Sequence, residues 1–167
     1  MRYVLILIVI WVAGCTGHKT DSGSVDRTLF VYGLDSLRSE KMEFKRQIPF
    51  ELRVTENDSA RIYQYIEKTD TTKQSFFVLR NKDKRMYWSS WEFKVEATEE
   101  FEINGKTIKF DLYRKDVPSM TGTGPFYFNE DYGVLDVNGY SRMFIYLENE
   151  NQAEADRLLK VLSTIYP

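Results

Sequence analysis

The sequence predicts an α+β fold: mostly an antiparallel β meander, built as an open sheet, a roll or a partial barrel, with one C-terminal helix packed on the sheet. Apolar and polar residues alternate with a period of two along much of the chain, as in strands that rest one face on a core. Short turn sequences separate these segments, and strands joined by short turns pair antiparallel. A helical apolar stripe appears near the carboxyl end.

The clearest strand covers residues 42–54. Its even positions are apolar with one exception, and its odd positions are polar or charged apart from Pro49. One face of this strand is therefore expected on the core and the other in water. Because proline cannot donate a ladder hydrogen bond, Pro49 predicts an edge position or a break in the strand.

Two later segments alternate in the same way. Over residues 87–97 the odd positions share one face, while charged residues occupy much of the other. Over residues 108–112 the apolar side chains at the even positions lie opposite Lys109 and Asp111. Both patterns predict strands with one buried face.

A hairpin is predicted from residues 61–67 and 75–80, across the polar loop between them. An alternative stays open, because Asp58 could instead cap a short helix over residues 59–66.

Two Asn-Gly pairs mark further turns. Asn104-Gly105 and Asn138-Gly139 each lie between apolar segments. This dipeptide accepts the positive φ that two-residue hairpin loops require. We therefore expect a tight hairpin at each pair.

One helix is predicted at the carboxyl end. Asn151 can cap it, and Glu154, three residues further on, completes a capping box. Apolar residues then follow at helical spacing: Ala155, Leu158, Leu159, Leu162 and Ile165. Such a stripe is typical of core packing, so we expect the helix to cover one face of the sheet.

The residue inventory excludes several kinds of active site. Cys15 is the only cysteine and His18 the only histidine, and both lie close to the amino end. A catalytic triad or a His/Cys metal centre therefore cannot be built in the domain, and we expect no cofactor and no metal. The acidic stretch of residues 129–133 is interpreted as a turn whose glycine takes a positive φ. A hydrolase that uses paired carboxylates stays open as an alternative function.

Aromatic residues suggest a binding surface. If one strand runs through residues 87–97, Trp88 and Trp91 face opposite ways, and Trp88 points outward when Trp91 joins the core. An outward Trp88 beside Tyr63 or Tyr65 could stack on a sugar or anchor a protein partner. The composition favours the other interpretation, in which a second layer covers this face.

The amino end carries the pattern of an exported chain. Residues 4–12 are apolar but too few to span a bilayer, and two small residues precede Cys15. The sequence Val12-Ala13-Gly14-Cys15 resembles the lipobox of bacterial lipoproteins. The resemblance implies cleavage before Cys15 and attachment of lipid to that cysteine, and it extends no further along the chain.

Three regions are therefore expected. Residues 1–14 are interpreted as a lipoprotein signal peptide, residues 15–26 as a flexible polar tether, and residues 27–167 as a single mainly-β domain. The formal net charge of −2 gives no basic surface for nucleic acid.

The resulting hypothesis is a membrane-anchored extracytoplasmic lipoprotein that acts as a non-catalytic binding or envelope-interaction module. Its expected partners are the membrane, through lipid on Cys15, and a protein, glycan or lipid bound by an exposed sheet face or by the loop of residues 117–125. No acidic run follows Cys15 of the kind some lipoproteins use for surface export. We therefore expect a cell-envelope location that faces the periplasm, at the outer membrane rather than the inner one.

Overall fold

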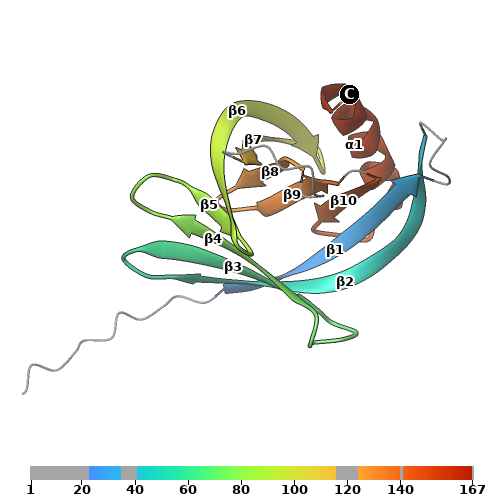
Figure 1. The fold of residues 1–167 in the computed structure, drawn as a ribbon. Coiled ribbons are helices and arrows are strands. Elements are labelled where there is room, and N and C mark those ends of the chain that lie inside the picture. Colours follow the sequence, from blue (N-terminus) through green and yellow to red (C-terminus); the bar gives the residue numbers. More distant parts are fainter. Residues whose placement is uncertain (1–22, 35–40, 116–123, 140, 167) are drawn as a thin grey trace, which may run out of the picture.

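The computed structural model describes residues 23–34, 41–115, 124–139 and 141–166. These residues form ten strands and one helix (Figure 1). The elements are, in order, β1 (Gly23–Leu34), β2 (Met42–Glu56), β3 (Ala60–Glu67), β4 (Gln74–Arg80), β5 (Met86–Trp88), β6 (Trp91–Ile103), β7 (Lys106–Lys115), β8 (Phe126–Asn129), β9 (Gly133–Asn138), β10 (Arg142–Leu147) and α1 (Gln152–Ile165). The predicted class, a mostly antiparallel sheet with one C-terminal helix, is confirmed.

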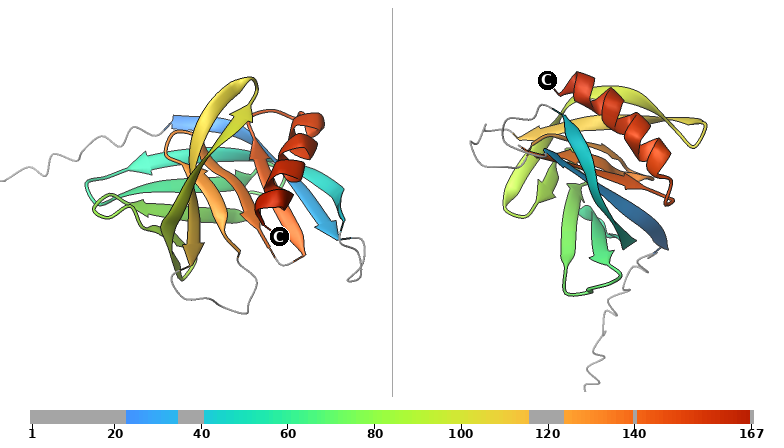
Figure 2. Two further views of the ribbon diagram at one scale, coloured as in Figure 1. Left: turned by 90° about the horizontal axis from the view of Figure 1, so that it is seen from above. Right: turned by 90° about the vertical axis from the view of Figure 1, so that its right-hand side faces the viewer.

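The strands form a closed ring. Each strand pairs antiparallel with the next one in sequence, and β10 returns to pair with β1, where Thr28 lies opposite Leu147. The ring is irregular, because its strands range from 3 residues in β5 to 15 in β2 (Figures 1 and 2). Closure removes most of the unpaired edges that an open sheet of this size would expose.

An interior cluster fills the ring. Every strand contributes to it, and aromatic rings dominate, meeting edge to face as in the pair Tyr63–Phe128, whose centroids are 4.8 Å apart. Its buried members are Leu29, Val31, Phe50, Leu52, Tyr63, Tyr65, Phe77, Leu79, Met86, Phe93, Tyr113, Phe126, Phe128, Val134, Val137 and Tyr146. Side chains therefore occupy the space in which rings of similar size can hold a ligand.

A second, helix-side cluster lies between α1 and the outer face of half the ring (Figure 2). It joins α1 to residues of β1 and of β6 to β10. Its buried members are Phe30, Tyr32, Phe101, Ile103, Phe110, Leu112, Tyr127, Tyr132, Leu135, Met143, Ile145, Leu147, Ala155, Leu158 and Leu162. The predicted packing of the helix on the sheet is confirmed.

The amino end of α1 differs from the predicted capping box in one respect. Asn151 caps the helix as predicted, because its Oδ1 accepts the Glu154 N–H at 3.3 Å. The Glu154 carboxylate does not return to Asn151 but accepts the Asn104 N–H at 3.2 Å. A tertiary contact with the β6–β7 turn has replaced the local one, so α1 is fixed to the sheet at its first turn.

The structure settles the character of β2 and β3. Residues 60–67 are a strand that pairs with β4, so the hairpin is confirmed and the alternative helix is wrong. Pro49 lies where β2 parts from β3: the first β2–β3 pair is Phe50 with Glu67, and residues before it pair with β1. The edge position predicted from Pro49 is therefore confirmed.

Two Asn-Gly turns have different outcomes. Asn104 and Gly105 form the predicted two-residue hairpin, with φ of 51° and 72°. Asn138 instead belongs to β9 and pairs with Met143, and the Gly139 N–H donates to the Arg142 carbonyl at 2.8 Å. The second hairpin is present, but its loop is longer than predicted.

Some expectations fall on residues that the structure does not describe. Cys15, His18, the signal peptide and residues 117–123 all lie outside the described ranges. At the border, β1 already begins at Gly23, so residues 23–26 of the expected tether belong to a strand and pair with residues 51–54.

Candidate functional site: a groove between α1 and the start of β2

Tyr63 and Tyr65 are not exposed, so the possible binding surface beside Trp88 is wrong, and the favoured interpretation, in which these aromatics are covered, agrees with the structure. Both side chains are completely buried in the interior cluster. The Tyr65 hydroxyl accepts the Val134 N–H at 2.7 Å, and the Tyr63 hydroxyl donates to the Glu130 carbonyl at 2.7 Å. Burial raises the pKa of both phenols, so they remain neutral structural hydrogen-bonding groups. Neither tyrosine can stack on a ligand.

The prediction that Trp88 and Trp91 face opposite ways, made for one continuous strand, is wrong. A turn at Ser89 and Ser90, with φ of 56° at Ser89, breaks the strand predicted over residues 87–97. Trp88 and Trp91 are consequently cross-strand partners on the same face. Trp88 is half-buried and stacks on Phe77 with centroids 4.9 Å apart.

Trp91, at the end of β6, is the more exposed of the two indoles, with 40% of its surface accessible. The Lys115 Nζ lies 4.0 Å from the centre of its ring, which is a cation–π contact. An aromatic surface made of Trp88, Tyr63 and Tyr65 therefore does not exist in the folded chain.

A groove of about 750 Å³ lies elsewhere, between α1 and the first residues of β2. Its volume is within the range of sites that hold small molecules. The residues that line it come from β1, from the start of β2 and from one face of α1: Tyr32, Lys41, Met42, Glu43, Phe44, Gln152, Asp156, Leu159, Lys160 and Ser163. We call it the α1–β2 groove.

The floor of the groove is apolar. Tyr32 and Phe44 meet edge to face with centroids 5.9 Å apart, and Met42 and Leu159 pack against the helix-side cluster. Phe44 keeps 37% of its surface exposed. An exposed aromatic at the base of a concavity is where binding energy concentrates.

A change of strand phase brings Phe44 to this floor. Val31 lies opposite Arg46 and Tyr32 opposite Phe44, so β2 carries one extra residue, Lys45, at a bulge. The even residues after the bulge, such as Ile48, point into the ring, whereas Phe44 points outward beside Tyr32. The predicted alternation over residues 42–54 holds only from the bulge onward.

The rim of the groove is charged. Asp156 accepts a hydrogen bond of 2.7 Å from the Tyr32 hydroxyl, and burial together with this carboxylate raises the Tyr32 pKa. Glu43 forms an ion pair of 3.9 Å with Lys45. Lys160 is exposed and has no ion-pair partner among the residues that the structure describes. Both carboxylates thus have partners within the chain, and Lys160 is available to an anion.

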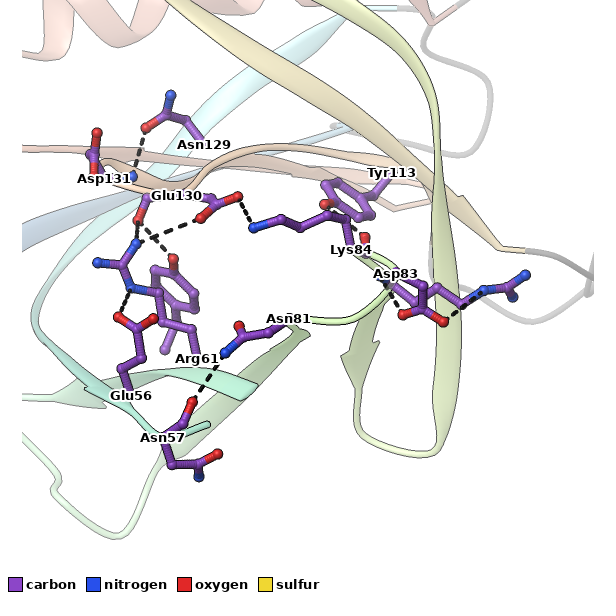
Figure 3. A network of polar contacts seen from close by, with 12 residues as sticks. Glu56, Asn57, Arg61, Asn81, Asp83, Lys84, Tyr113, Asn129, Glu130 and Asp131 are labelled. Atoms are coloured by element: carbon purple, nitrogen blue, oxygen red, sulfur yellow. Dashed lines mark hydrogen bonds and ion pairs between the residues drawn. The ribbon is translucent and has the colours of Figure 1, made fainter. Parts of the chain in front are cut away.

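The opposite end of the ring is closed by a polar network, which we call the sealed end (Figure 3). Glu130 lies at its centre, with Lys84 Nζ 2.6 Å and Arg61 Nη1 3.8 Å from its carboxylate. Arg61 also pairs with Glu56 at 3.2 Å, and the Asn81 amide donates to the Asn57 carbonyl at 3.0 Å. Three turns are thereby joined, so these acids have structural partners.

The acidic stretch of residues 129–133 is a turn, as predicted. The Asn129 Oδ1 accepts the N–H groups of Asp131 and Tyr132, and Gly133 takes a φ of 90°. Among the described residues, no three His, Cys, Asp or Glu side chains are grouped so that they could hold a metal ion.

One carboxyl has a strongly altered acidity. Asp136 is completely buried beside Tyr127 and Tyr166, and burial raises its pKa to about 8. Its Oδ1 accepts the Tyr127 N–H at 3.1 Å, whereas Oδ2 has no hydrogen-bond partner of good geometry among the described residues. No substrate can reach a fully buried group, so Asp136 is a structural acid and not a candidate catalyst.

Sequence reasoning missed the α1–β2 groove. Tyr32 and Asp156 are 124 residues apart in sequence, and neither belongs to a motif. The one available signal was Phe44, an aromatic in a strand stretch that also carries Glu43 and Lys45. Among the described residues, no helix has the length and apolar character needed to cross a membrane.

Comparison with known proteins finds no match: no family model, no curated protein and no solved structure is similar to this chain.

Proposed function

We propose that this chain is a lipid-anchored lipoprotein of the bacterial envelope whose domain binds a small amphipathic anion in the α1–β2 groove, without catalysis. The observation that carries the proposal is the composition of the groove. It has an apolar floor with a half-exposed ring at Phe44 and a cation at the rim, Lys160. An acyl chain or ring system would cover the floor, and its acidic group would face Lys160.

The filled interior supports an external site. Rings of about eight or more strands can hold one small ligand inside when side chains leave room. Here the interior cluster draws buried side chains from every strand. Binding is therefore assigned to the outer groove.

The position of the groove fits a tethered protein. Gly23, the first described residue, and Tyr32, on the groove floor, lie near opposite ends of β1. At about 3.3 Å per residue, the 12 residues of β1 span roughly 35 Å. A membrane anchor at Cys15 would join the domain at the end of β1 that carries Gly23, and the groove lies toward the other end of β1.

The anchor has its own test. Cys15→Ser should abolish incorporation of labelled palmitate and release the chain from membranes in a high-salt wash. A Cys15→Ser chain that stays membrane-bound after that wash would contradict the lipoprotein assignment. The result is independent of what the groove binds.

The binding test compares two amphiphiles of opposite charge. A chain that begins at Thr16, with folding checked by circular dichroism, is titrated with dodecanoate and with dodecylammonium by calorimetry. We expect dodecanoate to bind more tightly, and Lys160→Gln to weaken it by about fivefold, the size expected for one partly exposed charge contact. Lys160→Gln should leave dodecylammonium binding unchanged.

A matched pair of helix variants locates the site. Leu159→Glu introduces a charge into the groove floor and should abolish dodecanoate binding. Val161→Glu changes an exposed residue of the same helix that does not line the groove, and it should leave binding intact. Equal effects of the two substitutions, or no binding by the unaltered chain, would reject the proposal.

At the α1–β2 groove, the alternative function, hydrolysis by paired carboxylates, would have to use Glu43 and Asp156, the two acids that line it. Each is already engaged, Glu43 by Lys45 and Asp156 by the Tyr32 hydroxyl. We therefore favour binding. Ester or glycoside hydrolysis that disappears in Asp156→Asn but survives Lys160→Gln would favour the alternative.

A further inference from the structure

β2 extends well beyond its partner β3. β2 has 15 residues and β3 has 8, and their pairing starts only at Phe50. The Lys68 N–H, which donates to the Pro49 carbonyl at 2.9 Å, is the last backbone contact on that side. Among the described strands, residues 42–48 therefore pair with β1 alone (Figure 1). We call this stretch the β2 edge.

The β2 edge is exposed to solvent. The side chains of residues 43–47 are all exposed, Phe44 at 37%. Charged and apolar side chains alternate at its start, in the order Glu43, Phe44, Lys45. Charged residues on an edge strand disfavour indiscriminate pairing, so only a strand with complementary charges can add to it.

We propose that the β2 edge pairs antiparallel with the β2 edge of a second copy of this chain, with Phe44 on the two-fold axis. In this register Glu43 lies opposite Lys45 of the second copy, and Lys45 lies opposite its Glu43. Phe44 lies opposite Phe44. The edge is thus its own complement, which is the requirement for a two-fold interface.

The side-chain directions agree with this register. Glu43 and Lys45 share one face, since their charged groups are 3.9 Å apart and the Lys45 methylenes lie 3.6 Å from the position of a Cβ on Gly33, the partner of Glu43. Phe44 points to the other face, onto Tyr32. A two-fold axis perpendicular to the sheet keeps the two faces separate. The four charges then gather on one face, and the two Phe44 rings meet on the other.

The pairing has a structural consequence for the α1–β2 groove. Phe44 lines the groove and also lies on the proposed axis. Joining the two edges therefore places the two grooves side by side, with Phe44 of each copy at their shared border. Opposite charges and aromatic pairs across strands stabilise such a pairing, in addition to the backbone hydrogen bonds of the new ladder.

The test uses the full chain, extracted from membranes with detergent. Glu43→Lys alone sets lysine against lysine at both contacts, and Lys45→Glu alone sets glutamate against glutamate. Each variant by itself should be monomeric by light scattering at concentrations where the unaltered chain is dimeric. A mixture restores opposite charges, because the Glu43→Lys chain has two lysines at these contacts and the Lys45→Glu chain has two glutamates.

The decisive measurement is co-capture. Tagged Glu43→Lys should retain untagged Lys45→Glu on an affinity resin, and should not retain untagged Glu43→Lys. A change of the ion pair within one chain cannot produce this pattern. Lys106→Glu, at an exposed position of the β6–β7 turn, should remain dimeric. A monomeric unaltered chain, a dimer that tolerates both single reversals, or folded variants that do not pair when mixed would each overturn the proposal.

Discussion

The two ends of the ring are built by different physics. At the sealed end, three turns are joined by ion pairs and by carbonyl contacts around Glu130, and Gly133 lets the chain pass close over the interior cluster. At the groove end, β2 extends beyond the end of β3, and α1 covers Phe44 only in part. The contrast indicates that polar groups at the sealed end serve the fold, whereas unused surface at the groove end is available for recognition.

The largest loss of stability should come from adding a side chain at Gly133, at the sealed end. A Cβ on Gly133 would lie 2.5 Å from the Tyr65 hydroxyl and 3.1 Å from Leu52, at a φ of 90°. Gly133→Ala should therefore lower the free energy of unfolding by about 5 kcal/mol, comparable to the stability of a small domain.

Urea unfolding followed by circular dichroism measures this loss. Gly23→Ala is the matched control, because a Cβ there meets nothing within 4 Å and the backbone is not left-handed. It should change stability by less than about 0.5 kcal/mol. If Gly133→Ala were as mild as Gly23→Ala, close packing at the sealed end would be disproved.

The next largest effect should be a dependence of stability on pH, caused by the buried Asp136 on the α1 side of the ring. Burial raises the Asp136 pKa from the ordinary 3.8 to about 8, so the folded chain holds a proton there that the unfolded chain has lost. The contribution of this group to stability should therefore be greatest below about pH 4 and should fall as pH rises to about 8, by a few kcal/mol. Above that pH the contribution of this group is constant.

Asp136→Asn separates this group from others. The amide keeps an oxygen for the Tyr127 N–H and cannot ionise, so the decline between pH 4 and 8 should shrink. The groups that face Asp136 are Tyr127 and Tyr166; Arg114 acts on both tyrosines, and Glu99 acts on Tyr127. Urea midpoints over the pH range give the measurement, and an unchanged slope in Asp136→Asn would refute a buried protonated acid beneath α1.

A smaller loss is expected from one hydroxyl in the interior cluster. Tyr65→Phe removes the acceptor of the Val134 N–H and leaves that buried donor without a partner. The expected cost is about 1–3 kcal/mol. Tyr87→Phe removes a phenol that donates to Glu92 at 2.7 Å near the surface, and it should cost less than Tyr65→Phe. Equal costs for the two would mean that the Tyr65 contact is replaced by water.

The smallest effect should come from the ion pairs of the sealed end themselves. Glu130 is exposed, and Glu130→Gln keeps the carbonyl that accepts from Tyr63. Loss of the contacts with Lys84 and Arg61 should cost about 1 kcal/mol or less and should vanish in high salt. Dodecanoate binding should be unaffected. Weaker binding in Glu130→Gln would break the functional distinction between the two ends.

The sequence pattern predicted the features that depend on neighbouring residues, but not those that depend on contacts between distant parts of the chain. Asn104-Gly105 formed its predicted turn because positive φ is a property of the residues themselves. The prediction of one continuous strand over residues 87–97 is wrong, because the chain makes a tight turn at Ser89 and Ser90. An alternating pattern of apolar and polar residues does not reveal such a turn. That single turn reverses which of Trp88 and Trp91 is covered.

The sequence by itself determined the fold class, the helix over residues 152–165, the edge position of Pro49 and the absence of histidine and thiol from the domain. These follow from periodicity, capping and composition, which are local. Tertiary structure alone decided that the sheet closes, that the interior is filled and that Asp136 is buried. Tertiary structure also decided the position of the α1–β2 groove. A bulge at Lys45 and the packing of α1, more than 100 residues away in sequence, together place Tyr32, Phe44 and Asp156 around one space.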